Sequence, residues 1–243
     1  MALLRSHLLA LPVLLFALSL TGCITTPASQ TGWSKKAREA RPIACGEDGL
    51  IEDLEDADTQ TLKRAGRGGY WYPMIDSYGS EMTPAGGQFE VDGPGHAGSK
   101  HAAHMVGQLA PSAPNVYPYA GLGFGLAEAG TYDASRYKGV TFWAKGPGKV
   151  RFEIPDGYTS PKGGWCSDCY NDFGVEIGLT EQWEQYTVLF DWLLQKPNWG
   201  DRRPKITPAE LVAFEWEFNS QGRAFDIWVD DVAFVCGVEG EQP

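Results

Sequence analysis

The stretch KVRFEIPD, residues 149–156, alternates apolar and charged side chains. Successive residues of a β-strand point to opposite faces of a sheet, so the apolar residues share one face, and Arg151 and Glu153 share the other. The pattern predicts a strand with one face in a hydrophobic core and the other open to solvent or ligand.

The same alternation occurs in DFGVEIGL, residues 172–179, and in LVAFEWEF, residues 211–218. In each stretch the aromatic and aliphatic residues fall on one face and the glutamates on the other. If the three strands are neighbours, one sheet face carries an arginine and four carboxylates: Arg151, Glu153, Glu176, Glu215 and Glu217.

Further strand-like runs are separated by turns rich in Gly, Pro, Asn and Asp, and they lie at residues 49–56, 99–109, 139–146, 184–190 and 225–235. Helical periodicity is nearly absent. DWLL and TPAELV each suit about one helical turn, with Thr207 as N-cap and Pro208 at the first helical position of the second. Many short strands predict an all-β fold, an antiparallel β-sandwich of the jelly-roll type.

The N-terminal segment predicts export. Residues 1–22 carry one cation, Arg5, followed by an apolar run over residues 8–20 that is too short to span a bilayer, as in a signal peptide. The segment ends in LTGC, which resembles a bacterial lipobox and predicts lipidation of Cys23. Ile24 follows where an aspartate would be the usual inner-membrane signal, which favours the outer membrane. The alternative is an ordinary signal peptide with a chance cysteine.

The rest of the 243-residue chain reads as one domain. Residues 23–42 are polar without apolar periodicity, which predicts a flexible tether. We expect the β-sandwich to span residues 43–238 and a short tail to span residues 239–243.

The chain is acidic, with a formal net charge of -11 and a sequence pI of about 4.8. Removal of residues 1–22 takes one cation away and leaves -12. No Lys/Arg cluster of the kind that neutralises phosphates is present, so we expect no nucleic-acid partner. Acidic character does suit divalent cations.

Four cysteines remain after Cys23, and an exported protein is expected to form disulfides. If the first and last strands are neighbours, Cys45 and Cys236 pair and close the domain, which leaves Cys166 with Cys169. A redox role for the Cys-x-x-Cys pair would require a helix after Cys169, and none is expected. The short disulfide is expected instead to stiffen a loop.

The polar face allows two interpretations. Antiparallel sheets are commonly solvated on one side. Alternatively, the face binds sugar: each carboxylate or guanidinium group can hold two hydroxyls at once, and nearby rings can cover the apolar faces of pyranoses. Rings are available at Tyr70 and Tyr72, which share a face, and at Trp165 and Tyr170, which flank the Cys-x-x-Cys pair.

The motifs LIEDLED, YKGVTFWAKG, KVRFEIPD, EQWEQYTVLFDWL and FDIWVDDVAF, in this order, resemble a family 11 carbohydrate-binding module or a close relative in the galactose-binding-like jelly-roll group. The resemblance covers residues 49–235. It implies binding of a β-glucan-type polysaccharide on a concave sheet face through Arg151 with neighbouring carboxylates and tyrosines. Glu217 stands approximately where the family has a cleft tyrosine, which indicates either a different glycan or a cleft that uses hydrogen bonds in place of ring stacking. The expected ligand-binding set is Tyr70, Tyr72, Arg151, Glu153, Trp165, Tyr170, Glu176, Glu215 and Glu217.

The resemblance also implies a structural calcium ion near the junction of the first and last strands. Acidic residues gather in both segments, and hard oxygen ligands of this kind suit Ca²⁺. Family and strand parity favour Glu55 and Asp230 as ligands. Two paired acidic strand ends without a cation would repel each other.

Two other functions remain open. A glycoside hydrolase of the cellulase type would use paired carboxylates, and Glu215 and Glu217 lie roughly 7 Å apart along one strand face. A structural or adhesive component of the cell envelope would need no glycan. As a binding module, the lipoprotein would hold polysaccharide for a partner glycoside hydrolase or envelope protein.

Overall fold

A computed structural model describes residues 31–85, 88–111, 113–220 and 223–240. The predicted signal peptide, the lipidation site at Cys23 and the start of the predicted tether lie outside these residues, as do the last three residues of the tail. Within the described ranges, no helix is both long and apolar enough to cross a membrane.

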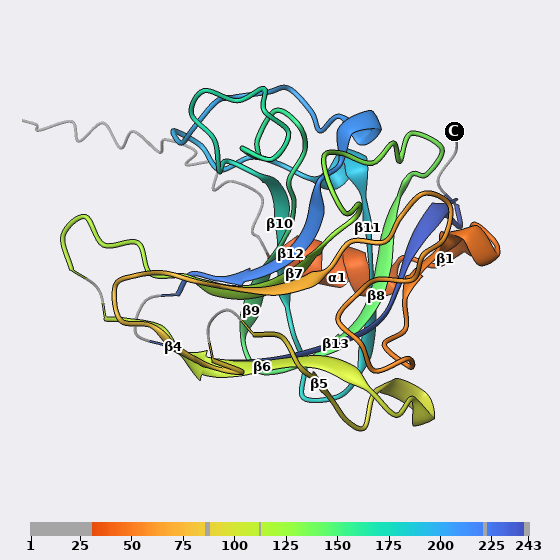
Figure 1. Cartoon of the computed structure of the whole chain (residues 1–243), viewed down its shortest axis with the longest axis horizontal. Helices are drawn as coiled ribbons and strands as arrows, with labels where there is room; N and C mark the ends of the chain where they lie inside the picture. Colours follow the sequence, from red (N-terminus) through yellow and green to blue (C-terminus); the bar gives the residue numbers. More distant parts are fainter. Residues whose placement is uncertain (1–30, 86–87, 112, 221–222, 241–243) are drawn as a thin grey trace, which may run out of the picture.

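The described strands form two antiparallel sheets that face each other (Figure 1). The larger sheet has the order β11-β8-β13-β6-β4. Its strands are β11 (Glu184–Leu189), β8 (Gly139–Lys145), β13 (Ala224–Val238), β6 (Ala102–Gln108) and β4 (Glu81–Thr83), with β1 (Pro42–Ala44) and β2 (Leu50–Glu52) paired to β13 and β5 (Val91–Asp92) paired to β6.

The smaller sheet has the order β10-β9-β12-β7-β3. These strands are β10 (Phe173–Gly178), β9 (Lys149–Ile154), β12 (Ala213–Phe218), β7 (Ala120–Gly125) and β3 (Trp71–Ile75). The predicted all-β sandwich is therefore confirmed, and the three alternating stretches are neighbours in one sheet, as the shared polar face requires.

Aromatic side chains from the inner faces of both sheets form the core. The Trp216 ring of β12 packs against Phe152 of β9 at 5.2 Å between ring centroids and edge-on against Phe142 of β8 at 5.1 Å. All three side chains are fully buried. Each contributes roughly 2–3 kcal/mol through burial of apolar area, so this contact holds the two sheets face to face.

Both predicted disulfides are present. Cys45 bonds Cys236, and Cys166 bonds Cys169. The first bond joins the end of β1 to β13, and these strands pair directly. The single turns expected at DWLL and TPAELV are present as 3₁₀ turns at Phe190–Trp192 and Pro208–Glu210.

The predicted tether is wrong for residues 31–42. Helix α1 (Thr31–Glu39) packs against β10 and β11, which are edge strands of the two sheets, and β1 begins at Pro42. Ala37 is buried, and the Gly178 backbone N–H donates to Ser34 Oγ at 2.7 Å. Only Trp33, Ala37 and Ala40 mark the apolar side of this helix, a signal too short to distinguish from a polar linker.

Candidate functional site

The polar face of the smaller sheet is organised as two rows of residues that run across neighbouring strands. Strand register pairs each residue with the next one in its row. The first row is Tyr72, Gly123, Glu215, Glu153 and Gly174, and the second is Met74, Gly121, Glu217, Arg151 and Glu176. The register therefore brings together residues that are up to 143 positions apart in the chain.

Glycines flank the carboxylates of the first row on both sides. A Cβ atom at Gly123 would lie 2.6 Å from the Phe214 carbonyl oxygen and 2.8 Å from Glu215 Cγ. A Cβ at Gly174 would lie 2.9 Å from Glu153 Cγ. Larger residues would collide with these groups, so the glycines keep space beside Glu215 and Glu153.

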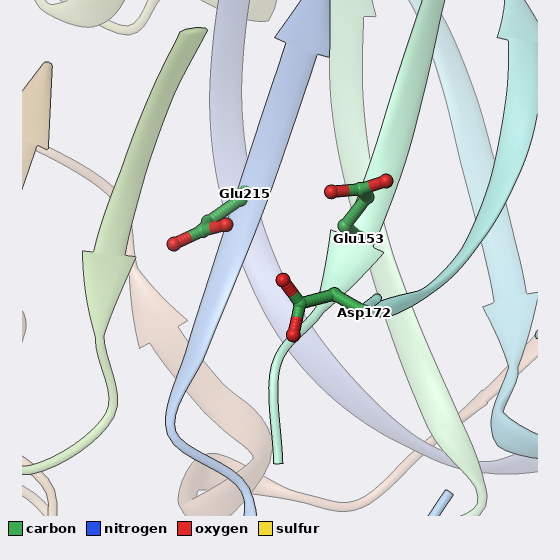
Figure 2. Close-up of side chains that lie close together, drawn as sticks. All are labelled: Glu153, Asp172 and Glu215. Carbon is green, nitrogen blue, oxygen red and sulfur yellow. The ribbon is translucent and has the colours of Figure 1, made fainter. Parts of the chain in front are cut away.

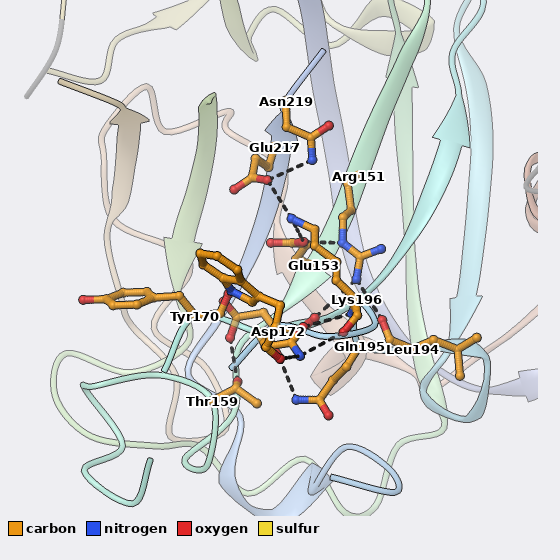
Figure 3. A network of polar contacts seen from close by, with 12 residues as sticks. Arg151, Glu153, Thr159, Tyr170, Asp172, Leu194, Gln195, Lys196, Glu217 and Asn219 are labelled. Carbon is orange, nitrogen blue, oxygen red and sulfur yellow. Dashed lines mark hydrogen bonds and ion pairs between the residues drawn. The ribbon is translucent and has the colours of Figure 1, made fainter. Parts of the chain in front are cut away.

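Two cations bind the carboxylates of this face (Figure 3). The Arg151 guanidinium donates through Nε to Glu153 Oε1, and its Nη2 donates to the Leu194 carbonyl oxygen at 2.8 Å. Lys196 Nζ lies 3.4 Å from Glu153 Oε1 and 3.2 Å from Glu217 Oε1. The two cations therefore connect β9, β12 and the segment after the Phe190–Trp192 turn.

Three carboxyl groups meet at the end of the first row (Figure 2). Oxygen atoms of Glu153, Asp172 and Glu215 all lie within 4.8 Å of one another. The Tyr72 hydroxyl donates to Glu215 Oε1 at 2.5 Å, and the Thr159 hydroxyl donates to Asp172 Oδ1 at 2.6 Å. Arg151 and Lys196 already supply positive charge to Glu153, so we interpret this carboxyl cluster as a hydrogen-bonding surface and not as a metal centre.

The carboxyl cluster has perturbed acidity. Burial raises the pKa of Glu215 to about 7, against a smaller lowering by the Tyr72 hydrogen bond. Burial, with Glu153 and Glu215 nearby, raises the pKa of Asp172 well above its usual value. Burial and Glu153 likewise raise the pKa of Glu217. Protonated carboxyls can donate as well as accept, so the cluster can match both kinds of hydrogen bond from a sugar hydroxyl.

We expect Glu215 to make the protein less stable as pH rises. A carboxyl whose pKa is raised on folding favours the folded state below pH 4.5, and this contribution is lost as pH rises through about 7. Between pH 4.5 and 8, Glu215→Gln should gain about 3 kcal/mol of unfolding free energy relative to wild type. Urea titrations across this range measure the difference. The groups that face Glu215, namely Glu153, Glu217, Tyr72 and Lys162, change the size of its pKa shift, but burial of Glu215 is the main cause.

A second variant makes this prediction sharper. The Tyr72 hydrogen bond lowers the pKa of Glu215, so Tyr72→Phe should move the midpoint of the stability change to higher pH. A constant stability difference between wild type and Glu215→Gln at all pH values would contradict the prediction.

The structure brings together only part of the predicted ligand-binding set. Tyr72, Arg151, Glu153, Glu215 and Glu217 form the two rows. Glu176 lies at the sheet edge in the second row, where its carboxylate is 3.9 Å from Lys149 Nζ, outside the network.

The predicted ring residues lie around the edge of this face. Tyr70 is half exposed just before β3, and Tyr170 and Trp165 are exposed on the loop held by the Cys166–Cys169 disulfide. Trp165 packs over Gly157 and against Tyr158, with 4.8 Å between ring centroids.

Asp172 and Lys196 are site residues that sequence reasoning missed. Lys196 lies outside the regular strands, so no alternation assigns it a face, whereas Asp172 directly precedes β10 and has the parity of Glu176 in the alternating stretch at residues 172–179, a signal that could have placed it on the polar face. The Asn171 side chain holds Lys196 by accepting from its backbone N–H at 2.9 Å and donating to its carbonyl oxygen at 3.1 Å. The polar LLQKPNWG turn gave no periodic signal for this placement.

The predicted calcium ligands lie around one turn near the junction of β2 and β13. Ser99 donates its hydroxyl to Glu55 Oε1 at 2.8 Å, and the same oxygen accepts from two further backbone N–H groups. Asp230 is fully buried and accepts from the His96 and Asp231 backbone N–H groups, each at 2.8 Å.

One further oxygen in this region lacks a protein partner. Glu52 of β2 is 1% exposed, and its Oε2 has no hydrogen bond among the described residues. A buried carboxylate oxygen without a donor is costly, and a cation bound there would offset the cost. These carboxylates are of the oxygen type that Ca²⁺ takes as ligands, but among the described residues the set of three whose ligand atoms lie within 4.8 Å of one another is Glu153, Asp172 and Glu215, not this junction.

The fold defined by these two sheets is that of carbohydrate-binding modules. No protein-family model and no curated protein sequence matches the chain. A family 11 carbohydrate-binding module from Clostridium thermocellum, solved with a β-1,3-1,4-mixed-linked tetrasaccharide, superposes with a TM-score of 0.55 and 12% identity. The match covers 79% of this chain and 96% of the module.

Two further solved structures agree with this assignment. The family 11 module of the cellulosomal cellulase Lic26A-Cel5E of C. thermocellum has a TM-score of 0.52 at 12% identity, over 85% of this chain and 99% of its own. The family 30 module of the cellulosomal cellulase Cel9D-Cel44B of C. thermocellum has a TM-score of 0.51 at 15% identity, over 75% and 98%. The resemblance to family 11 is therefore confirmed at the level of the fold.

Proposed function

We propose that this protein binds a β-glucan-type polysaccharide, without cleaving it, on the polar face of its smaller sheet. The observation that carries the proposal is the pair of rows in which an arginine, a tyrosine and four glutamates lie on one sheet face. A structurally similar module was solved with a β-1,3-1,4-mixed-linked tetrasaccharide, which supports the choice of ligand class.

The chemistry of the polar face suits sugar hydroxyls. Carboxylates and guanidinium groups form charge-assisted hydrogen bonds, often to two hydroxyls at once. Arg151 and Glu153 are already oriented by their mutual ion pair and by Lys196, so a ligand would order few new side chains. The exposed rings around this face supply apolar surface for pyranose faces.

A polysaccharide panel with the full chain tests the proposal. We expect β-glucan in a native gel to retard the protein, and the mixed-linked tetrasaccharide to give a saturable calorimetric signal, with no release of reducing sugar. The same titration with EDTA measures the calcium contribution. Lack of binding to every glucan, xylan and mannan tested would overturn the proposal and favour the structural envelope component, for which co-purification of envelope proteins is the readout.

The proposal extends to calcium and to the membrane. We propose that Glu55 and Asp230 help to hold a structural calcium ion, supported by the unpaired oxygen of Glu52, which is three residues before Glu55 and pairs across the sheet with Val232 of β13. EDTA should then lower the melting temperature, and added Ca²⁺ should restore it.

We also propose that Cys23 is lipidated in the outer membrane and that the domain serves a partner glycoside hydrolase or envelope protein. A mature N-terminus with an unmodified Cys23 in mass spectrometry would contradict the anchor.

Glycoside hydrolysis is the second candidate, and the carboxyl cluster is the observation that favours it. Glu153 contacts two cations, whereas burial raises the pKa of Glu215 to about 7, and different environments of this kind separate a nucleophile from a general acid. Oxygen separations below 4.8 Å are close to those of retaining enzymes. Release of reducing sugar that disappears in Glu215→Gln would establish this activity in place of simple binding.

A further inference from the structure

Three exposed aromatic side chains gather on loops beside the polar face. Tyr170 is 69% exposed, Tyr117 is 63% exposed and Trp199 is 48% exposed. We call these three residues the aromatic rim. Large rings on a protein surface are individually ordinary, but a group of them from separate loops is typical of a binding surface.

Two rings of the aromatic rim lie close together, and a hydrogen bond links the third residue to them. The Tyr117 and Trp199 ring centroids are 6.1 Å apart, with an angle of 57° between the ring planes. The Trp199 indole N–H donates to the Tyr170 carbonyl oxygen at 3.1 Å. The only polar atom of this indole is therefore satisfied within the protein, and its ring remains available for an apolar contact.

Hydrogen bonds and a disulfide hold the loops that carry the rim. Gln195 donates to the carbonyl oxygens of Asn171 and Asp201 at 2.7 and 2.8 Å. Asp201 accepts in turn from the backbone N–H groups of Ser167 and Asp168, inside the loop closed by the Cys166–Cys169 disulfide. These loops need little ordering when a ligand binds.

The aromatic rim is continuous with the polar face. Lys196, whose ammonium group contacts Glu153 and Glu217, precedes Trp199 by three residues in the same segment. Burial raises the pKa of the Tyr119 phenol, and the nearby Glu217 of the polar face and Tyr170 of the rim raise it further. The Tyr170 ring extends away from the carboxyl cluster, as Figure 3 shows. A ligand chain on the polar face would therefore meet these rings as it leaves the sheet.

We propose that the aromatic rim is a second subsite for the same glycan chain, where pyranose rings stack on Trp199 and Tyr117. This inference rests on the proposed function and adds a chain-length requirement to it. Short oligosaccharides occupy the polar face alone, whereas longer chains also reach the rim. The ligand class is then the interior of an extended polysaccharide whose pyranoses offer an apolar face, and not a terminal mono- or disaccharide.

Calorimetry with β-1,4-glucan oligosaccharides of two and six sugars tests this subsite. Wild type should bind the hexasaccharide at least about ten-fold more tightly than the disaccharide. Trp199→Ala with Tyr117→Ala should remove about ten-fold of hexasaccharide affinity and leave disaccharide affinity unchanged. Ile43→Ala is the control, because this exposed apolar side chain lies on β1 of the larger sheet, and both affinities should stay as in wild type.

The outcomes separate this inference from the proposed function. If wild type binds neither oligosaccharide, the proposed function itself is rejected. Hexasaccharide binding that is unaffected by the double substitution would leave the proposed function intact and overturn the subsite. If wild type forms a dimer that the double substitution dissociates, as measured by light scattering, the rim is a contact between copies of this chain and the subsite is likewise rejected.

Discussion

Replacing Cys45 and Cys236 together with serine should lower the free energy of unfolding by about 3–5 kcal/mol. The bond links residues 191 positions apart, so its loss frees most of the domain in the unfolded state. In the folded state it also fastens β1 and β13, which the strand pairing alone joins over only three residues of β1. Denaturant titration of the oxidised wild type and the double variant measures the difference.

The second disulfide provides the matched control. Cys166 and Cys169 are three positions apart, so removal of their bond should cost under about 2 kcal/mol. Its effect on glycan affinity should be larger than its effect on stability, because the bond stiffens the loop that presents Trp165 and Tyr170. If the two double variants lost equal free energy of unfolding, the number of residues between the bonded cysteines would not explain how much the Cys45–Cys236 bond stabilises the protein.

Arg151→Ala should abolish measurable glycan binding and lower stability by about 3 kcal/mol. The side chains of Arg151 and Glu153 are 11% and 5% exposed, and removal of one partner leaves a buried carboxylate without its main cation. Lys196 still contacts Glu153, which places the loss at the lower end of the range for buried ion pairs. Calorimetry and urea unfolding measure the two effects.

The same sheet contains a control pair. Lys149 of β9 pairs with Glu176 of β10, but their side chains are 54% and 27% exposed, so Lys149→Ala should cost under about 1 kcal/mol. Arg151→Met combined with Glu153→Gln should recover stability while glycan binding stays absent. Glycan binding at wild-type affinity in either Arg151 variant would show that the ligand does not use the polar face.

Strand alternation predicts the polar face because the period of two is a local property. Arg151, Glu153, Glu215 and Glu217 could be assigned to one face from short stretches, provided that their strands were neighbours. Their row partners could not be assigned, because register depends on pairing between distant strands. Strand β7, whose glycines make space beside Glu215 and Glu217, gave no strand signal, since Gly121 and Gly123 have no side chains to alternate.

Residues outside regular strands limited the prediction of the site. Asp172 and Lys196 enter the network through hydrogen bonds from Thr159 and Asn171, and no local pattern encodes such contacts. The aromatic rim shows the same limit, because Tyr117, Tyr170 and Trp199 meet only through folding of three separate loops. Cysteine pairing was predictable on the condition that the first and last strands are neighbours, and the pairing of β1 with β13 meets that condition.

Helix α1 determines how far the domain can stand from a membrane. Because the helix is packed against β10 and β11, only residues 24–30 separate its first residue from Cys23. Seven residues reach at most about 25 Å, whereas a domain of this size is roughly 40 Å across. On the lipoprotein proposal, the protein would therefore stay within one diameter of the bilayer, near the edge formed by β10 and β11. It would then collect polymers that lie against the cell surface and would be unable to reach those held at a distance from it.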